Sequence, residues 1–246
     1  MKYAPLIAAA LLISGVAEAA DIEVLSTQAT EEAYKELVAQ FEKSSGHKVS
    51  TIFTGTLDVQ KRLAAGETYD LIIMADAAVD DQIKLGKAVA GSRVNLAKSA
   101  VGAGVKAGAA KPDISSVDAL KKTLLAAKSI GYSTGPSGVY IISMFDKLGV
   151  GTEVKPKLTQ TPTGVFVGTI VANGTVEIGF QQVSEMSQFP GVDYVGPLPS
   201  AVQQVTTFSV GAHTAAKEPQ AAKALVNFLS APAAAPAYKK RGLDPA

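Results

Sequence analysis

Apolar and polar positions along the chain switch repeatedly between a strand-like and a helix-like pattern. Residues 22–26 form a short apolar run typical of a buried strand, and residues 28–46 repeat apolar positions at helical spacing. Residues 47–55 alternate as a strand does, and residues 57–67 return to helical spacing. Residues 69–76 are almost continuously apolar, as expected for a parallel strand covered on both faces. The first third of the chain therefore predicts a β-α-β-α-β order, which is an open α/β lobe.

The same alternation continues to the C-terminus. Residues 94–108 are typical of extended strands that cross the molecule, and residues 115–128 have helical spacing after a Ser-x-x-Asp start that resembles a capping box. The remaining predicted strands are residues 129–133, 157–162, 176–182, 191–199 and 205–214, and the remaining predicted helices are residues 77–87, 137–150, 163–174 and 218–232.

This order predicts an α/β fold of two open lobes joined by two crossover segments. The first lobe is discontinuous and comprises residues 20–95 and 200–246, and the second comprises residues 96–199. Open α/β sheets bind ligands in a crevice beyond the carboxyl ends of their strands. We therefore expect a ligand cleft between the two lobes.

The N-terminus has the pattern of a cleavable secretory signal. A lone Lys2 precedes an apolar stretch, residues 4–16, which is followed by Ala17-Glu18-Ala19. We assign residues 1–19 to a signal peptide and expect export to the periplasm. The apolar stretch is short for a membrane span, and no cysteine follows it that would carry a lipid anchor.

Composition excludes several function classes. The 246 residues are 47% hydrophobic with a net charge of +1 and 6% aromatic residues, so neither a basic surface nor stacking platforms for nucleic acid are expected. The absence of cysteine removes thiol catalysis and most structural zinc sites. The two histidines, His47 and His213, are far apart and are expected at the surface. We expect no metal, no cofactor and no catalytic residue.

Small polar residues and glycine follow nearly every predicted strand, at the point where a helix begins. A helix N-terminus presents free N–H groups and a partial positive charge, so it binds anions without lysine or arginine. Each turn alone is an ordinary cap, and the prediction of an anion site rests on the recurrence of such turns in both halves of the chain. The candidate ligand-binding residues are Ser26, Thr27, Ala29, Thr30, Thr54, Thr56, Ala75, Ser133, Ser137, Gly138, Gly164 and Gln182.

Two other functions compete with this prediction. Ser137 lies in a Gly-Pro-Ser-Gly-Val stretch that is close to a G-x-S-x-G nucleophile elbow, but neither histidine has a recognisable partner context. We therefore do not expect a serine hydrolase. A receptor domain that presents its ligand to a sensor protein has the same sequence features as a transport protein.

The chain resembles the periplasmic solute-binding proteins of ABC transporters, and among them the molybdate-binding family with its type II fold. The resemblance covers essentially the whole mature chain. It is carried by RLAAGETYDLIIMAD (residues 62–76), GPSGVYIISMFDKLGV (residues 135–150), VANGTVEIGFQQVSE (residues 171–185) and EPQAAKALVNFLSAP (residues 218–232). It implies a monomer that captures a small anion between two lobes and delivers it to a membrane permease.

The resemblance also places the family's ligand contacts on this chain. Its first serine falls near Ala29, with Ser26, Thr27 and Thr30 as candidate replacements, and its second falls at or beside Thr56. Its backbone donors fall at Ser137 and near Gly164, and its tyrosine falls at Gln182. The first serine and the tyrosine are thus not kept. The ligand is left open between a molybdate-like oxyanion and a small organic carboxylate of the aconitate kind.

One arginine bears on this choice. Arg62 follows the second turn, on the helix predicted for residues 57–67. We expect it on a solvated helix face, although an arginine in reach of the cleft would grip a carboxylate with two hydrogen bonds.

Overall fold

The computed structural model describes residues 19–246. The predicted signal peptide lies outside these residues, apart from its last position. Within the described residues, no helix combines the length and the apolar character needed to cross a membrane.

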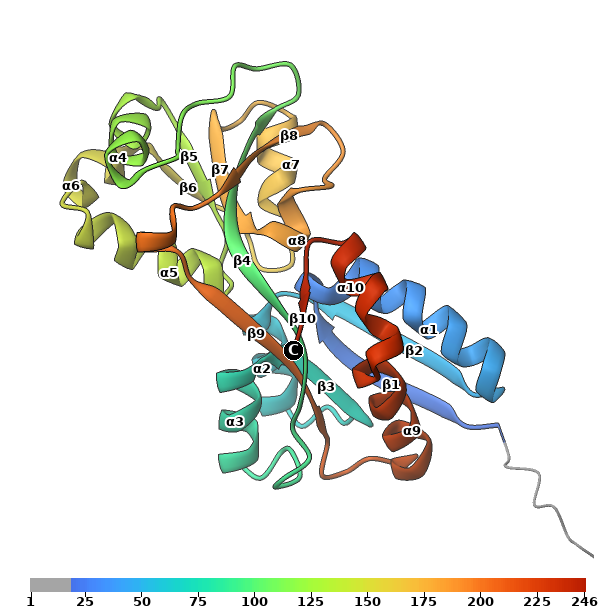
Figure 1. The fold of residues 1–246 in the computed structure, drawn as a ribbon. Helices are drawn as coiled ribbons and strands as arrows, with labels where there is room; N and C mark the ends of the chain where they lie inside the picture. The colour runs from blue at the N-terminus through green and yellow to red at the C-terminus, as the bar shows by residue number, and fades with distance from the viewer. Residues whose placement is uncertain (1–18) are drawn as a thin grey trace, which may run out of the picture.

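The described chain forms two α/β lobes on one curled sheet, as Figure 1 shows, and this confirms the predicted fold class. The order of the paired strands is β2-β1-β3-β9-β4-β7-β5-β6, with β8 and β10 paired to β4. The strands are β1 (Asp21–Thr27), β2 (Lys48–Thr54), β3 (Leu71–Ala75), β4 (Val94–Lys106), β5 (Ile130–Tyr132), β6 (Leu158–Gln160), β7 (Ile178–Gln182), β8 (Val192–Pro197), β9 (Val205–Ala212) and β10 (Asp244–Pro245).

Helices cover both faces of each half of the sheet. In the first lobe, α1, α9 and α10 pack on one face and α2 and α3 lie on the other (Figure 1). The helices are α1 (Glu31–Ser45), α2 (Thr56–Ala64), α3 (Asp76–Lys84), α4 (Val117–Ala126), α5 (Pro136–Lys147), α6 (Gly151–Val154), α7 (Val167–Ala172), α8 (Val183–Met186), α9 (Pro219–Ser230) and α10 (Ala235–Lys240), with a short 3-10 turn η1 (Gln28–Thr30).

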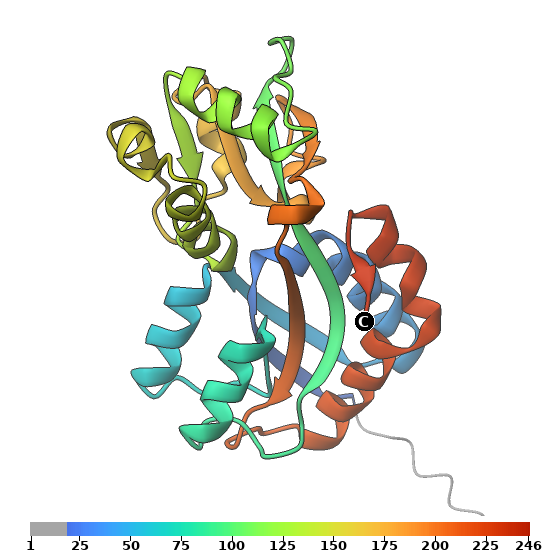
Figure 2. The same ribbon diagram turned by 60° about the vertical axis from the view of Figure 1, so that its left-hand side comes forward.

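The two lobes share strand β4. Its first half pairs with β9 as far as Ala100, and its second half pairs with β7 from Val101 onward. The sequence predicted several extended strands here, and the structure has one strand of 13 residues that belongs to both lobes. Figure 2 shows β4 and β9 running side by side between the lobes. These two strands therefore connect the lobes, and we call the place where they cross between them the hinge.

Gln203 fixes this hinge. Its side-chain oxygen accepts a hydrogen bond from Val101 N at 2.8 Å, and its side-chain nitrogen donates to Val101 O at 3.0 Å and to Leu198 O at 3.2 Å. One amide thus joins the strand that enters the second lobe to the segment that leaves it.

Three local expectations differ from the structure. The cap of α4 is Ser116, which accepts from Ala119 N, so the helix starts one residue later than the Ser-x-x-Asp pattern indicated. Helix α7 starts at Val167, because Gly164 with φ +77° turns the chain first. His213 is buried rather than at the surface, and its Nδ1 accepts from the Ala215 backbone at 3.1 Å.

Candidate ligand-binding site

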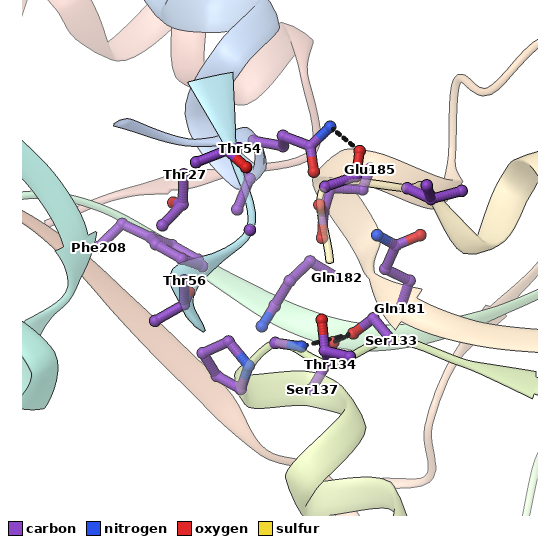
Figure 3. A pocket seen from close by; sticks show the side chains of 17 residues that line it. Thr27, Thr54, Thr56, Ser133, Thr134, Ser137, Gln181, Gln182, Glu185 and Phe208 are labelled. Atoms are coloured by element: carbon purple, nitrogen blue, oxygen red, sulfur yellow. Dashed lines mark hydrogen bonds between the residues drawn. The ribbon is translucent and has the colours of Figure 1, made fainter. Parts of the chain in front are cut away.

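A cleft between the lobes collects the carboxyl ends of strands β1, β2, β5 and β7 with the turns that follow them. We call it the donor cleft, and the solvent space inside it is about 40 Å³. Figure 3 shows side chains of both lobes arranged around one common space. The lining residues are Thr27, Gln28, Ala29, Thr54, Gly55, Thr56, Ser133, Thr134, Gly135, Pro136, Ser137, Gly164, Val165, Gln181, Gln182, Glu185 and Phe208.

The first lobe contributes the ends of two parallel strands. Thr27 and Thr54 are register partners, which places the turns after β1 and β2 side by side. The hydroxyl oxygen of Thr27 is buried and has no hydrogen-bond partner among the described residues. A buried hydroxyl without a partner loses its hydrogen bond to water on folding. A bound ligand or a water molecule would restore that bond.

The hydroxyl of Thr54, unlike that of Thr27, already donates its hydrogen bond within the protein. Its hydroxyl donates to Asp58 Oδ2 at 3.0 Å, and Asp58 also accepts from Arg62 Nε at 3.1 Å. These two contacts hold the pKa of the Asp58 carboxyl below its usual value. Thr54 therefore presents an acceptor to the cleft. Arg62 also binds Glu67 and does not line the cleft, in agreement with the expectation of a solvated helix face.

The second lobe contributes the turn from β5 into α5. Ser133 Oγ accepts from Gly135 N at 3.2 Å and lies 3.3 Å from Ser137 Oγ. Ser137 stands in the first turn of α5, where backbone N–H groups have no partner within the helix. This end of a 12-residue helix faces the cleft with its partial positive charge.

The two glutamines at the end of β7 serve the protein itself. Gln181 Oε1 accepts from Val167 N at 2.8 Å and so holds the start of α7. The side-chain amide of Gln182 lies 3.0 Å from Thr206 Oγ1. When its oxygen faces Thr206 and accepts from that hydroxyl, its nitrogen donates to Ser99 O at 3.0 Å, so both ends of the amide have a partner. We expected Gln182 to offer its amide to the ligand. The structure places the residue on the cleft wall, with its polar atoms bound to the hinge strands.

Glu185 is a lining residue that the sequence did not single out. It lies in the first turn of α8, three positions after the cap residue Gln182, where a glutamate commonly contacts the backbone of the cap. Burial raises the pKa of Glu185 to about 8, although contacts with Gln181 and with the Gln182 backbone oppose this shift. The carboxyl group is therefore mostly neutral at pH 7, and a neutral carboxyl group has an O–H that can donate a hydrogen bond to an anion.

Eight of the predicted ligand residues line the donor cleft, and four do not. Side chains alternate along a strand, so Ser26 points away from the face that Thr27 serves, and its hydroxyl donates to the Thr27 carbonyl. Gly138 packs against the backbone of Ser133, where a Cβ would lie 1.7 Å from the carbonyl oxygen. Thr30 is buried at the start of α1, and Ala75 ends β3 beside β9, both outside the cleft.

The lobes touch at one rim of the cleft. Gln28 Nε2 in the first lobe donates to Gly164 O in the second at 3.0 Å. Gly55 approaches the same turn so closely that a Cβ on it would lie 2.6 Å from Thr163 Oγ1 and 2.9 Å from Gly164 N. Gly55 thus permits a contact that a larger residue would prevent.

The lining set shows what the cleft can bind. It contains hydroxyl, amide and backbone donors and no lysine or arginine. Among residues 19–246, no three or more histidine, aspartate and glutamate side chains gather as metal ligands would. The chemistry of the cleft suits a small anion held by neutral donors, with Glu185 as the one acidic side chain on its wall.

Comparisons with known proteins agree with this geometry. A family profile described as bacterial extracellular solute-binding protein matches residues 22–244. The chain belongs to this family. An aconitate isomerase of Pseudomonas sp. is 34% identical over 230 residues, which cover 91% of this chain and 87% of the relative. A molybdate-binding protein of Azotobacter vinelandii is 29% identical over 94% of this chain and 92% of the relative.

Solved structures support the fold. The periplasmic molybdate-binding protein of Azotobacter vinelandii superimposes with a TM-score of 0.76 at 18% identity, over 90% of this chain and 98% of that chain. Together with the family profile and the molybdate-binding relative, this confirms the resemblance to molybdate-binding-type solute-binding proteins. Because one relative is named as an enzyme, the comparisons do not confirm the expectation of a protein without catalytic activity.

Proposed function

We propose that the protein captures a small organic anion with two or more carboxylates in the donor cleft. The closed form then presents this ligand to the membrane permease of an ABC transporter. Membership of the solute-binding family and the two-lobe fold support this reading.

The observation that carries the proposal is the mixture of neutral donors and apolar side chains around the donor cleft. Ala29, Pro136, Val165 and Phe208 line the donor cleft together with its hydroxyl and amide groups. The carbon skeleton of an organic acid packs against such side chains, and its carboxylates accept hydrogen bonds from the donors. An oxyanion with oxygen on every side has no apolar surface to offer. The relative named for aconitate, a tricarboxylate, supports the same choice.

Binding would proceed by closure of the lobes around the ligand. A carboxylate accepts hydrogen bonds from the Ser137 backbone in the first turn of α5 and from the unpartnered hydroxyl of Thr27. Rotation at β4 and β9 then brings Gln28 to Gly164 and removes the ligand from water. Hydrogen bonds to a charged acceptor contribute about 1.5–3 kcal/mol each, and each 1.4 kcal/mol corresponds to about a tenfold change in Kd.

A molybdate-like oxyanion is the second candidate. The observation in its favour is the small space of the donor cleft, about 40 Å³. At about 10–15 Å³ for each water molecule, this corresponds to roughly three waters, which is close to the size of a compact oxyanion.

We further propose that the protein acts as a monomer in the periplasm, after removal of the predicted signal peptide. A sensor protein that reads the closed form is the alternative partner. Uptake of a labelled ligand by cells with and without this chain separates transport from sensing, because a sensor-coupled protein leaves uptake unchanged.

Isothermal titration tests the ligand class. The purified mature chain is titrated with cis-aconitate, citrate and succinate, and separately with molybdate, tungstate and sulfate. The proposal predicts saturable binding of at least one polycarboxylate that is tighter than binding of molybdate. Tighter binding of molybdate establishes the second candidate, and no binding of any of these anions refutes both.

A further inference from the structure

Two threonine hydroxyls lie side by side in the donor cleft, and their protons are used differently. Thr27 and Thr54 are register partners on the parallel strands β1 and β2, so both side chains lie on the same face of the sheet, one strand spacing of about 4.8 Å apart. Figure 3 shows them next to each other. The Thr27 hydroxyl has no partner among residues 19–246, so its proton is free for a ligand. The Thr54 hydroxyl already donates to Asp58.

The direction of the Thr54 hydrogen bond is fixed by the charge of Asp58. The Thr54 hydroxyl lies 3.0 Å from Asp58 Oδ2, and Arg62 Nε donates to the same oxygen at 3.1 Å. Hydrogen bonds from Arg62 and from Thr54 hold the pKa of the Asp58 carboxyl below its usual value, so the group is ionised at neutral pH and only accepts. The Thr54 hydroxyl must therefore donate to it, and the lone pairs of its oxygen are left for the cleft.

A second acidic group holds Arg62 in this position. Arg62 Nη1 donates to Glu67 Oε2 at 3.2 Å, and the Tyr69 hydroxyl donates to the same oxygen. Every donor in this network, from Tyr69 to Thr54, thus points toward a carboxylate. Arg62 has a role here without contact with the ligand, because it keeps Asp58 ionised and so keeps the Thr54 proton turned away from the cleft.

The oxygen of Thr54 faces the second lobe across the cleft. A Cβ on Gly164 would lie 3.2 Å from Thr54 Oγ1, and both residues line the donor cleft. An oxygen of a fully ionised oxyanion at this point would bring its lone pairs against those of Thr54, which is repulsive. A ligand hydroxyl at the same point would donate a hydrogen bond to Thr54. The site therefore disfavours one class of ligand and favours the other at a single atom.

We propose that the ligand is a hydroxy acid whose hydroxyl donates to Thr54 Oγ1 while its neighbouring carboxylate accepts from the Thr27 hydroxyl. Asp58 is the positioning residue that imposes this preference. A 2-hydroxy acid carries its hydroxyl and a carboxylate on adjacent carbon atoms, so the two groups fit two threonines that are one strand spacing apart. The inference rests on the proposed function, because it needs a carboxylate ligand in the donor cleft, and it narrows that function to hydroxylated carboxylic acids.

Ligands that differ by one hydroxyl group test the inference. The purified mature chain is titrated calorimetrically with succinate, L-malate and D-malate, which are four-carbon dicarboxylates without and with a hydroxyl. We expect the better-bound form of malate to bind at least about fivefold more tightly than succinate, because succinate leaves the Thr54 oxygen without a donor. Succinate binding as tight as that of both forms of malate overturns the inference and leaves the proposed function standing. Absence of binding of every polycarboxylate overturns both.

Thr54→Val removes the acceptor and adds no charge. The ratio of malate affinity to succinate affinity should fall to within about twofold of one, mainly because malate binds more weakly. Both ligands are measured on the same variant, so a loss of stability that affects them equally leaves this ratio unchanged. Thr152→Val, at an exposed threonine of the second lobe, is the control and should keep the wild-type ratio. A wild-type ratio in Thr54→Val overturns the inference.

The role of Asp58 has a test of its own. Asp58→Ala frees the Thr54 hydroxyl to donate to a carboxylate of succinate, so succinate should bind more tightly and the ratio should fall. Asp58→Asn keeps an oxygen that accepts from Thr54 and should keep the ratio. Asp81→Ala, at an exposed acid of α3 paired with Lys84, is the control. A purely structural role would weaken both ligands equally, so a wild-type ratio in Asp58→Ala overturns the assignment of Asp58.

Discussion

Gly55→Ala should weaken ligand binding although it changes none of the hydrogen-bonding side chains that line the cleft. Ordinary contact begins at about 3.4 Å, so the new Cβ at 2.6 Å from Thr163 Oγ1 is about 0.8 Å too close, and at 2.9 Å from Gly164 N it is about 0.5 Å too close. The second neighbour is backbone, which cannot rotate away. The lobes must therefore stay slightly open at this rim.

The energetic cost of this substitution has two physical sources. Overpacking of this kind costs about 1–3 kcal/mol, and the Gln28–Gly164 hydrogen bond contributes about 1 kcal/mol where the rim opens. A net loss of about 2 kcal/mol corresponds to roughly a 30-fold weaker affinity. Isothermal titration measures this change, and small-angle X-ray scattering with saturating ligand should show a less compact complex.

Two further variants make this experiment decisive. Thr163→Ala alone removes only the side chain that the new Cβ would meet and lies outside the residues that line the cleft, so its affinity should remain within about threefold of the wild type. Adding Thr163→Ala to Gly55→Ala should restore part of the affinity, because the closest clash disappears. Wild-type affinity in Gly55→Ala would refute the closed-rim geometry.

Three other outcomes follow from the site. Thr27→Val should weaken ligand binding in isothermal titration by about 10- to 150-fold, because it removes a hydrogen bond to a charged group. Thr30→Val is the control: it removes an equally unpartnered hydroxyl outside the cleft and should leave the affinity unchanged. A bound anion favours the protonated form of Glu185, so the affinity for the ligand should be constant below about pH 8 and fall by up to tenfold per pH unit above it. Isothermal titrations at a series of pH values measure this dependence, and an affinity that does not change with pH would contradict it. Gln182→Leu should lower the free energy of unfolding by about 1–3 kcal/mol, because the Ser99 carbonyl loses its hydrogen-bond donor. Urea denaturation measures this change, and an unchanged denaturation midpoint would show that the Gln182 amide does not hold the two strands together.

The fold follows largely from local patterns in the chain. The sequence pattern indicates how many faces of an element are buried, as in the apolar run of residues 69–76 and the helical spacing of residues 28–46. Burial of these faces drives the helices and strands to pack into lobes. Thr27, Thr56 and Ser137 were predicted for the same reason, because a strand end followed by a helix start places a residue at the edge of the sheet. Ser26 does not line the donor cleft, because the alternation of side chains along β1 separates it from Thr27.

The other parts of the site depend on contacts between distant segments. Burial at the cleft raises the pKa of Glu185, and the sequence around Glu185 does not predict that burial. The roles of Gln182 and Gln203 depend on β4 being one strand shared by both lobes. Local pattern thus locates the cleft, and tertiary packing decides which groups on its wall are free to act.

A crystal structure of the mature chain with bound cis-aconitate would test the proposed binding mode at atomic level. We expect one carboxylate within hydrogen-bond distance of the Thr27 hydroxyl and the Ser137 backbone nitrogen, with the ligand enclosed in the donor cleft. A ligand bound outside the donor cleft, or inside it without contact to Thr27 and Ser137, would show that the two lobes do not capture the anion as proposed.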